Sequence, residues 1–231
     1  MGKGGGRLPL VVKSNLIARV HRRVPLDLFI VPEIEGGQVA ALSVHAGVWT
    51  SAALATPPHL VPRMRAQLSK LTARLGFSTS GHAGKALVHA LTKLPHDLLI
   101  GFEDDDLERV VVALMTLIDR PRPRLALVRA PLDRHLFAFV WLPRDALNTA
   151  LRTRIATMLA EASGARILDW AIEVESNALA ELRFVLDIRD SADLARLDEA
   201  ALDARLQAML RGWSDAVEAE LARSEDPARA A

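Results

Sequence analysis

A short glycine-containing segment, SGHAGK from Ser80 to Lys85, is the first place where residue types and spacing could bind a charged group. A phosphate-binding loop requires the pattern G-x-x-x-x-G-K-[ST], because glycines let backbone N–H groups surround the phosphate. Thr79 stands where the first glycine of that pattern belongs, and Ala86 stands where the final Ser or Thr belongs. The segment therefore predicts a helix start whose free N–H groups can hold an anion only weakly.

Three histidines, His82, His89 and His96, repeat at a constant interval and raise the question of a metal site. Metal binding would need all three on one face together with a further ordered ligand. Pro95 ends the expected helix before His96, and no carboxylate stands among the three. The spacing therefore predicts no metal site.

Two adjacent arginines, Arg22 and Arg23, follow His21 at the approach to an expected strand. The planar guanidinium fork of arginine can clamp a carboxylate or another anion. Positive charge along a strand edge also discourages pairing with other strands, so a solvated edge is the second interpretation. We favour the solvated edge and keep the anion clamp open.

The glycines do not form the fingerprint of a dinucleotide site, which is G-x-G-x-x-G between a strand and a helix. Gly2 and Gly4 precede every expected strand, and Arg7 stands in the place of the third glycine. Gly81 and Gly84 lack the earlier glycine of the pattern. We therefore expect no cofactor-binding residues and no catalytic residues in this chain.

The composition narrows the classes of function. The 231 residues include 29 Lys+Arg, 28 Asp+Glu and no cysteine, which gives a formal net charge of +1. The absence of cysteine rules out disulfides, thiolate metal sites and cysteine nucleophiles, and it is compatible with a reducing cytoplasm. The lack of a basic excess argues against a nucleic-acid or membrane-surface role. An uncharged run from Gly36 to Pro62 opens with Gly36-Gly37 and contains Pro57-Pro58 near its end, so we do not interpret it as a membrane span.

The charges are unevenly distributed along the chain. The tail from Asp190 to Asp226 is rich in acidic residues. Basic residues precede the first acidic residue, Asp27, at Arg7, Lys13, Arg19, Arg22 and Arg23. Both stretches are either solvated faces or docking surfaces for other parts of a larger protein.

The second half of the chain follows a regular pattern of strands and helices. Both faces are apolar from Leu136 to Leu142, which is typical of a central strand, and a helix with an apolar stripe then runs to Gly164. A second hairpin follows, with strands around Trp170–Val174 and Leu182–Ile188, and its apolar face is expected to be buried. A last helix starts at Asp198. This order predicts a four-stranded antiparallel layer with both helices on one face.

The first half is expected to be a hairpin-based sheet with extra helices. Glu35-Gly36-Gly37-Gln38 is a good hairpin turn, because glycine adopts the positive φ angles that a two-residue loop demands. Helices are expected at 60–75, at 82–94 and from Asp104 onward. The two prolines of Arg120-Pro121-Arg122-Pro123 predict a linker, so the expected domains are 1–120 and 121–231. The expected fold class is α+β, with two ACT-like or ferredoxin-like layers of antiparallel sheet and helices packed on one face.

Several longer phrases stand in a fixed order along nearly the whole chain: VHRRVPLDL, SGHAGKALVHALTKLPHDLLIGF, DRPRPRLALVR, VWLPRD, NTALRTRI, LRFVLDI and MLRGWSDAVEAEL. Together they resemble the N-terminal region of the large bacterial NAD-specific glutamate dehydrogenases. That resemblance implies ACT-like domains ahead of a catalytic core. It implies a regulatory or assembly segment without the part of the enzyme that does the chemistry.

The resemblance also implies cofactors and partners. The parent enzyme would convert L-glutamate and NAD to 2-oxoglutarate, ammonia and NADH, through lysines and an aspartate in a glycine-lined cleft, whereas this chain would hold no cofactor. The expected partners are the remaining domains of the same enzyme, further copies in a homo-oligomer and an amino-acid effector, all in the cytoplasm. The expected residues of an effector or interdomain contact are Arg22, Arg23, Gly81, His82, Gly84 and Lys85.

A second hypothesis comes from another class of protein. The chain could be a free-standing ACT-like module that binds a small molecule or forms oligomers. A reading frame that continues into a catalytic domain favours the first hypothesis, and a stop codon after Ala231 favours the second.

Overall fold

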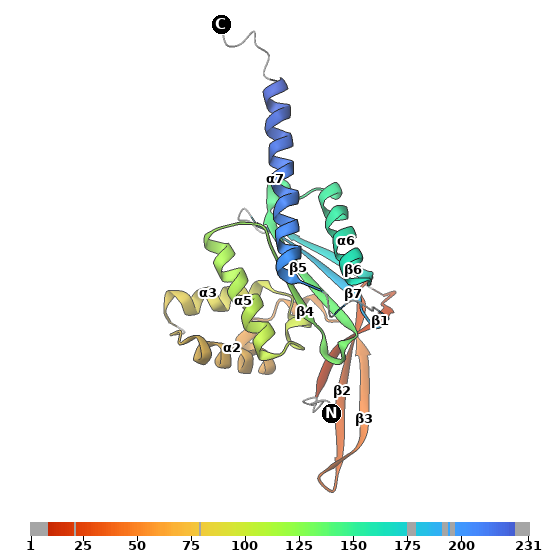
Figure 1. Cartoon of the computed structure of the whole chain (residues 1–231). Helices are drawn as coiled ribbons and strands as arrows, with labels where there is room; N and C mark the ends of the chain where they lie inside the picture. The colour runs from red at the N-terminus through yellow and green to blue at the C-terminus, as the bar shows by residue number, and fades with distance from the viewer. Residues whose placement is uncertain are drawn as a thin grey trace. The chain divides into compact units, whose positions relative to one another are not determined.

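The structure is a computed structural model that describes residues 9–20, 22–78, 80–174, 179–190, 194 and 197–224, with the side chains of 118–119 and 212–224 left undescribed (Figure 1). Backbone contacts divide the chain into two compact units. The first comprises Met1–Arg120 and Val128–Phe137, and the second comprises Pro121–Leu127 and Ala138–Ala231. The domain boundary expected near Arg120 stays a prediction.

The sheet of the first unit is an antiparallel meander of three strands in the order β1-β2-β3. The strands are β1 (Leu10–Ile17), β2 (Pro25–Glu35) and β3 (Gln38–Gly47). The predicted turn lies between β2 and β3, where Gly36 and Gly37 have φ angles of 58° and 80°. A side chain would be strained at these angles, so the two glycines allow the tight hairpin.

Helices form the rest of the first unit. They are α1 (Ser51–Leu54), η1 (Pro58–Leu60), α2 (Pro62–Leu75), α3 (His82–Lys93), α4 (His96–Leu99) and α5 (Asp104–Asp119). Gly76 follows the last residue of α2 in the left-handed conformation, and the helix ends at residue 75, as predicted. The longer helices bury one apolar face each, with residues that include Met64, Leu71, Leu87, Leu91, Val110 and Leu114.

Ion pairs join the C-terminal half of α2 to the N-terminus of α5. Lys70 Nζ lies 2.9 Å from Asp104 Oδ2, and the Arg74 guanidinium lies 2.7 Å from both Asp105 Oδ1 and Glu108 Oε2. Carboxylates in the first turn of α5 also interact favourably with the helix dipole. These pairs are largely exposed, so each contributes little to the stability of the fold.

The second sheet has four strands in the order β4-β5-β7-β6. The strands are β4 (Arg124–Arg129), β5 (His135–Pro143), β6 (Arg166–Val174) and β7 (Leu179–Asp187). The helical segments are η2 (Pro131–Asp133), η3 (Arg144–Ala146), α6 (Thr149–Ser163) and α7 (Glu199–Ser224). The predicted central strand is confirmed, because β5 lies between two other strands and is buried from His135 to Leu142.

Two local signals determine where α6 begins and ends. The Asn148 side chain accepts a hydrogen bond from the Leu151 N–H at 2.8 Å and caps the N-terminus. Gly164, with φ of 65°, follows the C-terminus of α6 in the left-handed conformation.

The two antiparallel sheets, together with their helices, confirm the expected α+β fold class.

Carboxylates of α7 accept hydrogen bonds from backbone N–H groups on the outer edge of β4. Asp203 Oδ1 accepts a hydrogen bond from the Leu125 N–H at 2.7 Å, and Glu199 Oε2 accepts one from the Leu127 N–H at 2.8 Å. The second carboxylate oxygen of Asp203 lies 3.1 Å from Arg124 Nη1. An edge strand otherwise presents unpaired donors that invite association, so α7 closes this side of the sheet.

We predict that a protease of broad specificity cuts first at 120–124 or at the chain ends. Residues 120–122 are exposed, and the two prolines prevent a regular ladder there. Trypsin is poorly suited, because Arg120 and Arg122 each precede a proline and only Arg124 in this segment is a cleavable site. Mass spectrometry of the first fragments provides the measurement, and initial cleavage between Leu136 and Leu159 would contradict the predicted boundary.

We also predict that Asp203→Ala destabilises the second unit by about 2 kcal/mol, because the buried Leu125 N–H loses its acceptor. Arg205→Ala changes an exposed residue of the same helix and is the matched control. Urea unfolding followed by circular dichroism measures both variants. Equal effects of the two substitutions would show that the β4 edge does not need the Asp203 carboxylate.

Candidate functional site

The predicted glycine segment forms the start of α3. Gly81 is the residue before the helix and has extended backbone angles, and Gly84 is buried. His82 and Lys85 are exposed on the first turn. A Cβ atom at Gly81 would lie 3.3 Å from the Ser78 carbonyl oxygen, so the glycine allows a close turn. The segment has a clear packing role, and its role as an effector or interdomain contact stays a prediction.

The predicted arginine pair lies between β1 and β2. Arg22 and Arg23 are both exposed, and Arg22 Nη2 donates a hydrogen bond to the Trp49 carbonyl oxygen at 2.5 Å. His21 lies outside the described residues. Figure 1 shows this connection well apart from α3 within the first unit. The structure therefore does not bring the two predicted groups together into one site.

A shallow groove lies beside the end of α2. Its volume is about 490 Å³, and residues of α2 between Arg65 and Ala73 line it together with Gly76 and Phe77. None of the predicted effector residues lines this groove. With a single charged side chain in an open surface, it offers little to orient an amino acid.

A buried charge cluster, formed by Lys13, Asp27 and Asp97, was not predicted. Lys13 Nζ lies 2.7 Å from Asp27 Oδ1 and 2.6 Å from Asp97 Oδ2. Lys13 is 6% exposed and Asp27 is 2% exposed. The residues come from β1, β2 and α4, so the cluster joins the sheet to the helices of the first unit.

Burial governs the electrostatics of this cluster. Loss of hydration raises the pKa of Asp27 from 3.8 to about 6, although the nearby Lys13 ammonium acts in the opposite direction. The second carboxylate, Asp97, raises it further, and Arg22 lowers it. Lys13, shared by two carboxylates, cross-links β1, β2 and α4. Because Lys13 is buried, the prediction that it belongs to a solvated face or a docking surface is wrong.

One sequence signal could have identified the Lys13–Asp27 pair. Each residue is the single charge inside an apolar run, LVVKSNLI for β1 and PLDLFIV for the start of β2. Lys13 and Asp27 are direct partners in the antiparallel register. Opposite charges that face each other across a hairpin stabilise the pairing. Asp97 carried no such signal, because it is distant in sequence.

The three evenly spaced histidines lie in different environments. His82 and His89 are exposed on α3, whereas His96 is buried on α4. Burial lowers the pKa of His96, opposed by the carbonyl of Leu91 and the charge of Asp97. Among the described residues, no group of three or more His, Asp or Glu side chains could hold a metal ion.

The apolar residues of β6 depart from expectation. Trp170, Ile172 and Val174 are exposed to between 41% and 51%, although their partners on β7 are buried. The Arg152 guanidinium lies 4.3 Å from the centre of the Trp170 ring and covers part of it through a cation–π contact. The prediction that this face of the hairpin is buried is therefore wrong for β6, which is the terminal strand of its sheet.

No helix in the described part of the chain is long and apolar enough to cross a membrane.

Comparison with known proteins gives the decisive observation. A family model of the glutamate dehydrogenase ACT2 domain matches residues 124–214, and a model of glutamate dehydrogenase helical motif 1 matches residues 61–120. The NAD-specific glutamate dehydrogenase of Pseudomonas aeruginosa is 29% identical over 86% of this chain, and that of Halomonas elongata is 27% identical over 88%. The chain therefore contains segments that match two glutamate dehydrogenase domains, and most of its length is similar to NAD-specific glutamate dehydrogenases.

The resemblance found in the sequence is thus confirmed. The matched part of the chain spans only 12% and 13% of the lengths of these two glutamate dehydrogenases. Helical motif 1 corresponds to α2 through α5, and the ACT2 match begins with β4 and extends into α7. The β1-β2-β3 sheet precedes both matched segments.

We predict that Asp27 makes the stability of the first unit fall as pH rises. The folded state binds the Asp27 proton more tightly than the unfolded state, since its pKa is about 6 instead of 3.8. The resulting stabilisation is present below pH 3.8 and is lost as pH rises through about 6. Relative to Asp27→Asn, the free energy of unfolding of the wild type should fall by up to about 3 kcal/mol across this window.

Urea unfolding followed by tryptophan fluorescence, at several pH values, measures this difference. Asp27→Asn is nearly isosteric and removes the Asp27 titration. Subtracting the stability of this variant from that of the wild type therefore removes the pH dependence that the other carboxylates give to both proteins. A difference that stays constant or grows with rising pH would contradict the raised pKa.

Proposed function

We propose that this chain is a non-catalytic region that regulates or assembles an NAD-specific glutamate dehydrogenase. The observation that carries the proposal is the pair of family matches, a helical motif and an ACT2 domain, in a chain that matches about an eighth of the length of its relatives. The parent polypeptide would convert glutamate and NAD to 2-oxoglutarate, ammonia and NADH. Chemistry would then take place outside the region described here.

The secondary structure supports a non-catalytic role. Dinucleotide-binding folds alternate strands and helices to build a parallel sheet, with the cofactor at the carboxyl ends of the strands. Here β1, β2 and β3 form an antiparallel meander, and β6 and β7 form an antiparallel hairpin. The glycine fingerprint is also missing from the sequence.

The described lysines support the same proposal. Lys13 is buried between two carboxylates, and Lys70 is paired with Asp104 across two helices. Lys85 stands exposed on the first turn of α3, outside the groove at the end of α2. A catalytic lysine would need a cleft that holds the substrate and excludes water.

The partners that we propose are the remaining domains of the same enzyme and further copies of it. Two apolar strand surfaces, on β6 and on the β2–β3 hairpin, are exposed and available for such contacts. The acid-rich tail is less available than the sequence indicates, since Glu199 and Asp203 bind the edge of β4. An amino-acid effector at Arg22, Arg23 or the start of α3 is part of the proposal.

We predict that the purified chain neither binds NAD nor turns over glutamate. Calorimetric titration with NAD should give no binding heat, and glutamate should give no NADH formation. A full-length NAD-specific glutamate dehydrogenase is the positive control in both assays. Glutamate-dependent turnover that is lost in Lys85→Ala would overturn the proposal, because it would place a catalytic lysine in this chain.

A further inference from the structure

The distal half of the β2–β3 hairpin, residues 30–44, has one uniformly apolar face and one mixed face. The register pairs Ile30 with Val44 and Pro32 with Leu42, so these four side chains share a face. Ile34 continues it toward the turn and is paired with Val39. We call this set the hairpin face; its residues are Ile30, Pro32, Ile34, Val39, Leu42 and Val44. It carries no charge.

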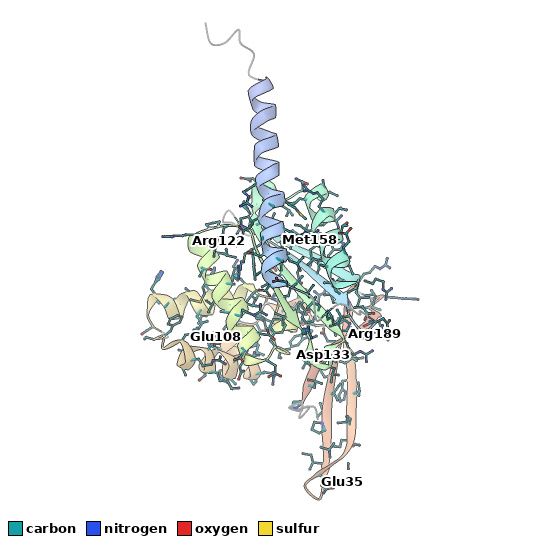
Figure 2. The ribbon with its side chains drawn as sticks, in the orientation of Figure 1. Glu35, Glu108, Arg122, Asp133, Met158 and Arg189 are labelled. Atoms are coloured by element: carbon teal, nitrogen blue, oxygen red, sulfur yellow. The ribbon has the colours of Figure 1, made fainter. Side chains whose placement is uncertain are left out.

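The opposite face of the same hairpin carries its polar residues, together with Val31 and Ala41. It presents Glu33 and Ser43, and the Ser43 hydroxyl lies 3.1 Å from His45 Nε2. Glu35, at the tip, alternates onto the same side (Figure 2). Polar groups on this side of the ribbon can hydrogen-bond to water, whereas the side chains of the hairpin face cannot.

The hairpin face is exposed in spite of its composition. Ile34 is 64% exposed and Leu42 is 53% exposed. Figures 1 and 2 show this end of the hairpin extending away from the helices of the first unit. Among the described residues β1 pairs with β2 only as far as Ile30, so the distal part is a two-stranded ribbon. Such ribbons are marginally stable in water unless something covers their apolar face.

The edges of the ribbon are poorly suited to strand addition. Pro32 lacks the N–H donor that an added strand would need beside β2. The register shifts between Glu33 and Ile34, which leaves Ala40 as an extra residue in β3. A bulge of this kind interrupts the ladder and twists the edge. Docking is therefore expected on the face of the ribbon and not along its edges.

We propose that the hairpin face docks onto an uncharged apolar surface of the parent glutamate dehydrogenase polypeptide outside this region. This inference rests on the proposed function and names one of its contact surfaces. The partner must be apolar and uncharged, because a charged group buried against this face would find no opposite charge. Most of the length of the relatives lies outside the part that this chain matches, so such a surface has ample sequence to come from.

The size of the hairpin face favours this partner over a second copy. Six partly exposed side chains offer about half of the roughly 800 Å² that each partner buries in a stable complex. A free dimer held by this face alone would be weak. A partner in the same polypeptide is present at a high effective concentration, so a small contact is sufficient.

Hydrogen exchange of the full-length polypeptide and of the isolated 231-residue chain tests the proposal. Amides of residues 31–44 should exchange at least about tenfold more slowly in the full-length polypeptide, because docking suppresses opening of the ribbon. The triple substitution Ile34→Thr, Leu42→Thr and Val44→Thr should abolish this protection. Val31→Thr, on the opposite face of the same hairpin, is the matched control and should retain it.

The outcomes separate the two proposals. If the full-length polypeptide protects other parts of the region but leaves residues 31–44 unchanged, the docking proposal is wrong and the proposed function stands. If no part of the region gains protection, both are wrong. Protection in the isolated chain that increases with concentration and is lost in the triple variant would identify a second copy as the partner and overturn the proposal. The wild-type comparison decides the question even if the triple variant fails to fold.

Discussion

A charge or a backbone donor that leaves water needs a partner of opposite character, and both units of this chain depend on that requirement. In the first unit the Lys13 ammonium lies between Asp27 and Asp97 and ties two strands to a helix. Removing Lys13 would leave two largely buried carboxylates without an opposite charge, which costs far more than an ion pair itself contributes. In the second unit the same requirement is met by Asp203 and Glu199, which accept the outer N–H groups of β4.

Local chemistry was predictable from the sequence, and distant pairing was not. Gly36 and Gly37 identified the hairpin turn and Gly164 the end of α6, because positive φ angles favour glycine wherever they occur. The Lys13–Asp97 contact joins residues 84 positions apart, so no window of sequence could reveal it. Trp170 shows a second limit, since alternation identifies an apolar face without saying whether anything covers it.

The candidate site shows the same division between local and distant information. Sequence reasoning selected Arg22 and the segment from Gly81 to Lys85. Arg22 lies in the connection between β1 and β2, which is well apart from the start of α3 (Figure 1). What the sequence presented as binding chemistry has local structural roles, a hydrogen bond to the Trp49 carbonyl oxygen and a close helix start. The surfaces that most need a partner are apolar and lie on strands, and for β6 the sequence had predicted a buried face.

These features describe a chain in which the buried Lys13 ammonium and the outer N–H groups of β4 have partners, whereas the apolar side chains of β6 and of the β2–β3 hairpin are exposed. That combination, together with matches to a helical motif and an ACT2 domain, fits a region of a longer enzyme. The most direct test is the mass of the natural polypeptide that contains this region, measured in extracts of its source cells by immunoblotting and peptide mass spectrometry. The account predicts a single species several times heavier than 25.2 kDa that also yields peptides of a glutamate dehydrogenase catalytic domain. A natural species of 25.2 kDa without such peptides would contradict it.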